Sequence, residues 1–269
     1  MLQNHAELET KSNNFTLSQL MKYGSFLMVF LFCVQFAQAQ KDKKTTQFGL
    51  HIRPVFPTRF IGEPELVLSQ DGFNTTIKQS LGLSFGGIIR WEYTKFLGLE
   101  SGINFTQRNF NLTMDVPDSN VSATNDLSFI AYDLPVNLLV FVQMTDNIFA
   151  NASFGVAAAF KPTNVGVLTL PGGSHSFTHT GRLYSKATLE FNANFGVEWR
   201  TKKSGRFYLG GSGRLPFKPV FEMIAQYKYQ GYKNTIRSGV DGSFLALDIK
   251  YFFPNISNKG TQFKEGPIR

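Results

Sequence analysis

Cysteine is almost absent from this chain, which contains one residue of that type, Cys33. A single cysteine cannot form an internal disulfide, and a metal site built on several cysteines is excluded for the same reason. Charged residues make up only 17% of the chain, and no apolar run reaches the roughly 20 residues of a transmembrane helix. No phosphate-binding glycine loop or nucleic-acid motif is present. The sequence therefore gives no support to a disulfide scaffold, a bundle of membrane helices or a nucleic-acid-binding protein.

Phenylalanine and glycine, by contrast, are abundant. The 269 residues include 28 Phe and 24 Gly, and the basic residues exceed the acidic ones by 8. This is far more Phe than the core of a soluble domain usually contains. Many aromatics and glycines with few charges indicate an all-β protein that carries aromatic side chains on its surface.

The N-terminal region resembles a secretory leader. Lys22 supplies a positive charge, residues 23–36 are apolar, and Ala37-Gln38-Ala39 forms a cleavage signal of the A-x-A type. About 14 apolar residues are too few to span a bilayer, and the alternative reading is a buried core helix. We therefore expect an N-terminal extension and signal peptide over 1–39, with Met21 as a plausible true start and cleavage after Ala39.

Strict alternation of apolar and polar residues recurs along the rest of the chain. In 186–200, for example, Leu189, Phe191 and Phe195 alternate with Glu190 and Asn192. A period of two residues is typical of strands with one apolar face. The segments with this pattern are 48–56, 80–93, 96–110, 129–143, 148–161, 186–200, 206–217 and 244–253.

The connections between these segments alternate in length. Short turns are expected at 94–95, 145–147 and 201–205, and long loops at 58–79, 112–126, 162–185 and 218–241. This layout, with an even number of strands, is typical of outer-membrane barrels. The sequence thus predicts an all-β, single antiparallel up-and-down transmembrane β-barrel over 40–253, followed by a C-terminal tail over 254–269. Eight strands are predicted; ten are possible if 218–232, which we interpret as a loop hairpin, adds two more.

Three stretches resemble the PorT-type outer-membrane β-barrel family, a group of small porin-like barrels. They are WEYTKFLGLESGINFTQR (91–108), YDLPVNLLV (132–140) and ALDIKYFF (246–253). The resemblance implies a location in the outer membrane of a Gram-negative cell envelope. The founding member of the family is linked to protein secretion, so the resemblance also suggests partners in the secretion apparatus.

Charged residues occupy the face that alternation turns into the barrel. An eight-stranded barrel is just wide enough for side chains to fill it, so these charges are expected to form ion pairs across strands. Glu100 and Arg108 lie about 26 Å apart along one strand and should pair with other neighbours. The predicted inward charges are Arg53, Arg90, Glu92, Glu100, Arg108, Asp133, Lys161, Lys186, Glu190, Glu198, Arg200, Arg214, Asp248 and Lys250. The predicted aromatic girdle at the turn end is Trp91, Tyr93, Trp199, Tyr251 and Phe253.

One segment has the residue types for catalysis. LPGGSHSFTHTG (170–181) contains Ser174, His175, Ser176 and His179, which offer a Ser–His pair or, on a helix, two metal ligands. Gly172, Gly173 and Pro171 argue against a helix, and an exposed loop is the favoured interpretation. We therefore expect no catalytic residue, no cofactor and no metal.

The preferred hypothesis is a non-enzymatic integral outer-membrane barrel with a structural or interaction role, which assists secretion or surface assembly. Its expected partners are membrane lipid and lipopolysaccharide, the barrel-assembly machinery and secretion proteins, but not nucleic acid. The alternatives are a barrel enzyme that modifies lipid A or phospholipid, and a secreted soluble ligand carrier. The basic residues expected to meet anionic lipopolysaccharide are Lys78, Lys218, Lys228, Lys233 and Arg237.

Overall fold

The computed structural model describes residues 45–201 and 203–254. The expected leader over 1–39 and residues 255–269 of the expected tail lie outside the described residues. No helix in the described ranges has the length and hydropathy to cross a membrane. The strands all belong to one compact unit. In chain order, the long and central strands are β1 (Thr45–Pro57), β3 (Phe73–Glu92), β4 (Leu97–Val116), β5 (Val121–Gln143), β6 (Ile148–Phe160), β9 (Ala187–Arg200), β10 (Arg206–Pro216) and β13 (Phe244–Phe252).

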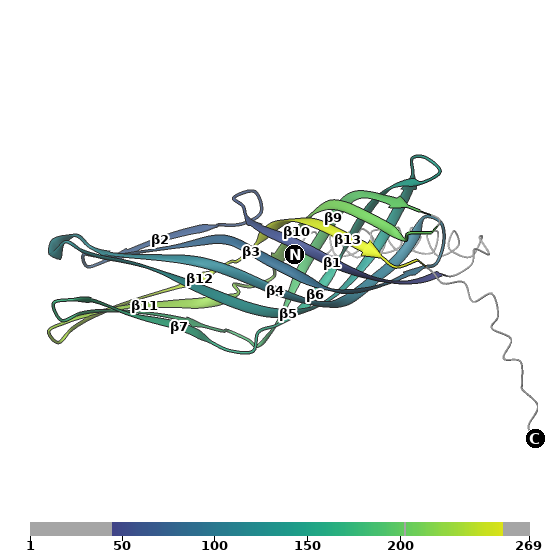
Figure 1. Cartoon of the computed structure of the whole chain (residues 1–269). Coiled ribbons are helices and arrows are strands. Elements are labelled where there is room, and N and C mark those ends of the chain that lie inside the picture. Colours follow the sequence, from purple (N-terminus) through teal and green to yellow (C-terminus); the bar gives the residue numbers. More distant parts are fainter. Residues whose placement is uncertain (1–44, 202, 255–269) are drawn as a thin grey trace, which may run out of the picture. The chain divides into compact units, whose positions relative to one another are not determined.

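These eight strands form a closed antiparallel barrel (Figure 1). Neighbours in the barrel follow the order β1-β13-β10-β9-β6-β5-β4-β3, and β1 also pairs with β3, which closes the ring. Closure leaves no sheet edge in this part of the fold, so every strand can hydrogen-bond to two neighbours. The prediction of an eight-stranded up-and-down barrel is confirmed, and the 218–232 hairpin adds no strand to it.

The barrel buries polar residues and exposes apolar ones. Along β5, buried and exposed residues alternate over most of the strand, with Asp133 and Asn137 inside. Leu134, Val136 and Leu138 point outward and are 41–49% exposed. A protein folded in water hides such residues, and a barrel surrounded by lipid presents them. The outer surface of the barrel is therefore suited to a hydrocarbon environment.

A second structure continues from one end of the barrel. The elements outside the barrel are β2 (Glu65–Gln70), the 3-10 turn η1 (Pro117–Ser119), β7 (Val165–Gly172), β8 (His175–Arg182), β11 (Phe221–Tyr229) and β12 (Tyr232–Val240). Strands β3, β4 and β5 extend beyond the barrel, and β2 pairs with the first part of β3. A separate four-stranded sheet, in the order β12-β11-β8-β7, packs against this extension, and Figure 1 shows β7 and β11 beside it.

The two layers form a β-sandwich with an ordinary apolar core. Phe110 and Phe129 from one layer meet Phe221 from the other, and the ring centroids of Phe129 and Phe221 are 4.0 Å apart. The predicted long loops over 58–79, 112–126, 162–185 and 218–241 are therefore largely strands. They form strands because their alternating apolar residues bury one another between the two layers, without contact with lipid.

Candidate functional site

The most distinctive chemistry in the described residues is a network of buried charges inside the barrel. Near the short-turn end, the guanidinium of Arg90 is fully buried and forms ion pairs with Glu100, at 2.9 Å, and with Glu198. Lys250 donates a hydrogen bond to the other oxygen of Glu100 at 2.5 Å. The Phe252 ring lies 3.8 Å from the Arg90 guanidinium carbon. Each charge here thus has an opposite charge within contact distance.

The same cluster continues toward the turns. Arg200 donates to Glu198 at 2.7 Å and to Glu92 at 3.3 Å. Arg206 donates to Glu92 at 2.5 Å and to Glu198 at 3.4 Å. The Arg200 guanidinium also lies over the Phe149 ring at 3.8 Å. Glu198 therefore accepts from three arginines, which compensates the cost of burying its carboxylate.

A smaller group occupies the middle of the barrel. Arg53 forms an ion pair with Asp248, and Asn194 donates to the second oxygen of Asp248 at 2.5 Å. The Tyr208 hydroxyl donates to Asn194 at 2.5 Å. Tyr208 fits inside because Gly196 faces it: a Cβ at Gly196 would lie 2.5 Å from the Tyr208 hydroxyl oxygen. A glycine is thus required where an aromatic ring fills the lumen.

The third group lies where the barrel meets the sandwich. Arg108 donates to both oxygens of Glu190, at 2.7 and 2.6 Å. Arg214 donates to Asp133 at 2.5 Å and lies 3.6 Å from Glu190. The Arg108 guanidinium also contacts the Phe244 ring at 4.9 Å. Because these side chains are 0–3% exposed, they close the lumen at this level.

The structure places the predicted inward charges as follows. Thirteen of the fourteen are buried or largely buried in the barrel, and Glu100 and Arg108 each pair with other residues. Lys186 is the exception: it is exposed just before β9, because the strand begins one residue later. Sequence reasoning missed Arg206, although Arg206 and the inward-facing Arg214 both occupy even positions of β10. The many glycines of β10 weaken the apolar–polar alternation, so the sequence did not show which positions face inward.

The aromatic residues at the turn end form a partial belt. The ring centroids of Phe207 and Tyr251 are 5.1 Å apart, those of Trp199 and Phe207 are 6.2 Å apart, and those of Tyr251 and Phe253 are 5.3 Å apart. Phe207 was not among the predicted girdle residues and joins Trp199 to Tyr251. The predicted members Trp91, Tyr93, Trp199, Tyr251 and Phe253 are all half-buried or exposed on the surface.

The candidate catalytic segment is a β-hairpin, so the predicted exposed loop is wrong. Ser174 lies in its turn with a positive φ of 65°. His175 stacks on Tyr229, with ring centroids 4.1 Å apart, and its Nδ1 lies 2.8 Å from the Tyr227 hydroxyl. Ser176, next to His175 in a strand, points to the opposite face. The hairpin therefore does not place His175 and Ser176 on one face of β8 as a Ser–His pair.

His179 is four residues further along the same strand, about 13 Å from His175 at the usual rise. It is buried between the two layers, where its Nε2 lies 3.0 Å from the Thr75 hydroxyl. Burial lowers the pKa of His179 to about 4, so the ring is neutral at pH 7. Two histidines at this separation cannot share a metal ion. Within the described ranges, no group of three or more His, Cys, Asp or Glu is placed to hold one.

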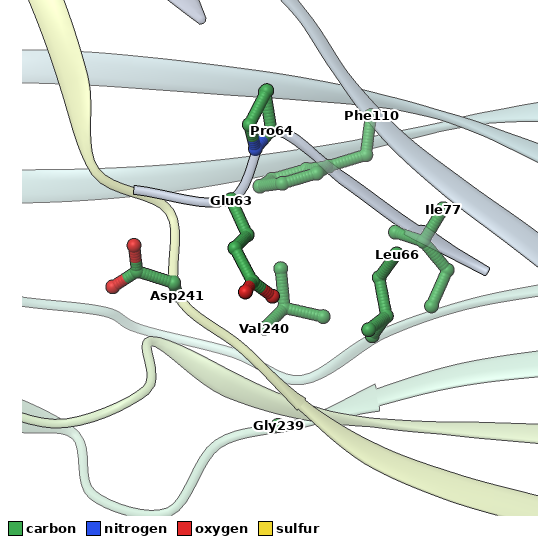
Figure 2. Close-up of a pocket in the computed structure, with 8 residues that line it drawn as sticks. All are labelled: Glu63, Pro64, Leu66, Ile77, Phe110, Gly239, Val240 and Asp241. Atoms are coloured by element: carbon green, nitrogen blue, oxygen red, sulfur yellow. The ribbon is translucent and has the colours of Figure 1, made fainter. Parts of the chain in front are cut away.

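A small cavity of about 40 Å³ lies in the sandwich beside the connection from β1 to β2. Figure 2 shows the Glu63 carboxylate turned toward Val240, while the Asp241 carboxylate points away from it. Asp241 accepts a hydrogen bond from Ser243 at 2.6 Å. A cavity of this size holds a few water molecules, not an organic ligand. Its lining residues are Glu63, Pro64, Leu66, Ile77, Phe110, Gly239, Val240 and Asp241.

Comparisons with known proteins give distant structural similarities only. No protein-family model and no curated protein matches the chain. The outer membrane protein OprG from Pseudomonas aeruginosa has a TM-score of 0.44 at 10% identity, over 78% of this chain and 97% of that one. The E. coli outer membrane protein W has a TM-score of 0.28 at 13% identity, over 79% and 100%. The β domain of the Bordetella autotransporter BrkA has a TM-score of 0.29 at 10% identity, over 79% and 99%. None of these similarities assigns a function to this chain.

Proposed function

We propose that this chain is an integral outer-membrane barrel whose role is structural or interactive, and that its sandwich is displayed outside the membrane. The observation that carries the proposal is the reversal of polarity between the two parts. The barrel buries charges such as Arg90 and exposes Leu134 and Val136, whereas the sandwich buries Phe110 and Phe221. A soluble ligand carrier would have an apolar interior throughout, so this arrangement favours a lipid environment for the barrel alone.

The packed lumen supports a non-enzymatic and non-conducting role. Buried ion pairs fill it at the short-turn end, in the middle and at the sandwich end. Opening a path would require the separation of pairs such as Arg108–Glu190, which cost several kcal/mol each to leave unpaired. The resemblance to the PorT-type family favours assistance to secretion or surface assembly, with the sandwich as the surface that a partner would contact.

Membrane insertion can be tested by fractionation and by probe depth. The barrel should resist extraction with carbonate and should migrate differently on electrophoresis with and without boiling. Ile103 and Thr113 point outward on the same strand, Ile103 from the barrel and Thr113 from the sandwich. In single-cysteine variants, we expect a label at Ile103→Cys to be quenched by a lipid-soluble quencher and a label at Thr113→Cys by a water-soluble one. Release by carbonate, or equal quenching at both positions, would contradict the proposal.

A further inference from the structure

An apolar groove of about 310 Å³ lies where the outer surface of the barrel meets the sandwich. This volume falls at the lower end of the range for ligand pockets, roughly 300–1,000 Å³. The groove is formed by the start of β9 and the segment that follows β10, two neighbouring strands of the barrel (Figure 1). Its lining residues are Tyr184, Ser185, Ala187, Thr188, Leu189, Phe217, Lys218 and Pro219.

The floor of the groove is continuous with the lipid-facing surface. Leu189 and Phe217 are 56% and 60% exposed, and the Phe217 amide donates to the Leu189 carbonyl at 3.1 Å. Phe191 and Leu215, directly paired on the same strands, continue the exposed apolar surface along the barrel. An acyl chain from the surrounding bilayer could therefore enter the groove without crossing a polar barrier.

The sandwich bounds the opposite end of the groove. A Cβ at Gly239 of β12 would lie 3.2 Å from Pro219 and 3.5 Å from the Tyr184 hydroxyl, so both residues pack closely against that strand. Tyr184 is itself 57% exposed and presents its ring to the groove region. An aromatic ring with a hydroxyl at this level suits the boundary between acyl chains and headgroups.

A lysine gives this end of the groove a positive charge. Lys218 lines the groove, whereas Lys186, between the lining residues Ser185 and Ala187, is exposed but does not line it. Within residues 45–201 and 203–254, neither lysine forms an ion pair with a carboxylate. The other basic residues expected from sequence to meet lipopolysaccharide, such as Lys228 and Lys233, lie on the sandwich. Lys218 is thus the lysine that lines this apolar groove.

We propose that this groove binds a phosphate-bearing lipid of the surrounding leaflet, with an acyl chain between Leu189 and Phe217 and its phosphate near Lys218. The inference rests on the proposed membrane location and names a lipid for that surface. Charge complementarity selects an anionic headgroup, and the apolar floor selects a lipid over free phosphate. The site is on the outside of the barrel and is independent of the charges in the lumen.

Native mass spectrometry of the detergent-solubilised barrel tests the proposal. Phosphatidylglycerol and phosphatidylcholine with identical acyl chains serve as probes, with inorganic phosphate as a third arm. We expect the anionic lipid to remain bound in preference to the zwitterionic one, and inorganic phosphate not to compete with it. Equal retention of the two lipids, or displacement by phosphate, would overturn the assignment.

Two pairs of variants locate the site. Lys218→Gln should lower retention of phosphatidylglycerol about two- to fivefold, as expected for one partly exposed ion pair, and Lys203→Gln at the opposite end should not. Ala187→Trp should block the groove and abolish retention, whereas Ala152→Trp, elsewhere on the outer surface, should not. If neither groove variant differs from its control, the groove does not bind lipid. A barrel that fractionates with membranes and still shows this result would refute only the lipid site, not the membrane location.

Discussion

Replacement of Glu100 by Gln tests whether the lumen charges stabilise the barrel. Glu100 is buried and is the carboxylate shared by Arg90 and Lys250. In the variant, Arg90 keeps its ion pair with Glu198, but Lys250 loses its hydrogen-bonded carboxylate. Lys250 keeps the face of the Tyr208 ring, 5.1 Å away, and the more distant charge of Asp248. Loss of one partner from a buried pair typically costs about 3–5 kcal/mol, because the remaining charge stays buried without compensation. We expect the free energy of unfolding to fall by about that amount.

The measurement is urea unfolding in phospholipid vesicles, followed by tryptophan fluorescence and by heat-dependent mobility. A second variant isolates the mechanism: Lys250→Met in the Glu100→Gln background removes the uncompensated ammonium and should restore part of the lost stability. Glu65→Gln is the matched control, since Glu65 pairs at 3.6 Å with an exposed Arg59, and such pairs contribute about 0–1 kcal/mol. The reasoning fails if Glu100→Gln unfolds at the wild-type midpoint, or if the double variant is less stable than the single one.

Three further outcomes are expected. The pKa of His179, lowered to about 4, lies below the usual 6.5, so the unfolded chain binds more protons than the folded chain between these pH values. The free energy of unfolding should therefore fall by up to about 3 kcal/mol as pH drops from 6.5 to 4, and this pH dependence, measured by limited proteolysis of the sandwich, should be weaker in His179→Gln. The Gly196→Ala variant should fail to fold and should show no heat-dependent change in mobility, because its Cβ would lie 2.5 Å from the Gly210 Cα. The Gly211→Ala variant has space for its Cβ and should fold. Phe221→Ala should destabilise the sandwich by about 3–5 kcal/mol, measured as faster protease cleavage there while the barrel keeps its mobility shift.

The barrel strands could be predicted from sequence because lipid imposes a simple rule on them. Apolar residues must face outward at every second position, so Leu189, Phe191 and Phe195 alone define the orientation of β9. The lumen partners could not be predicted pair by pair. Alternation fixes which side Glu190 faces, but the choice of Arg108 as its partner depends on the stagger of strands that are 82 residues apart in sequence.

The sandwich was missed for a different reason. In β3, the inward residues Phe73, Thr75 and Ile77 occupy odd positions, while Ser84 and Arg90 occupy even ones. A shift in the pairing of β3 with β4 between Ser80 and Leu83 separates the two sets. Such a bulge changes the inward-facing positions from odd to even residue numbers, so a single alternating pattern does not continue through it. The segment before the bulge therefore looked like a loop.

Strand β4 runs from the barrel into the sandwich, and its even positions face inward along its whole length. The residue types along β4 therefore locate the boundary between the two parts. Its inward even positions are charged or polar up to Arg108 and apolar from Phe110 to Val116. Its outward odd positions change in the opposite sense, from Ile103 in the barrel to Thr113 in the sandwich. Both faces reverse within a few residues of Arg108, which indicates that the surrounding solvent changes there from lipid to water. The Arg108–Glu190 pair at this level thus belongs to the last charged layer of the lumen, directly beneath the apolar core of the sandwich.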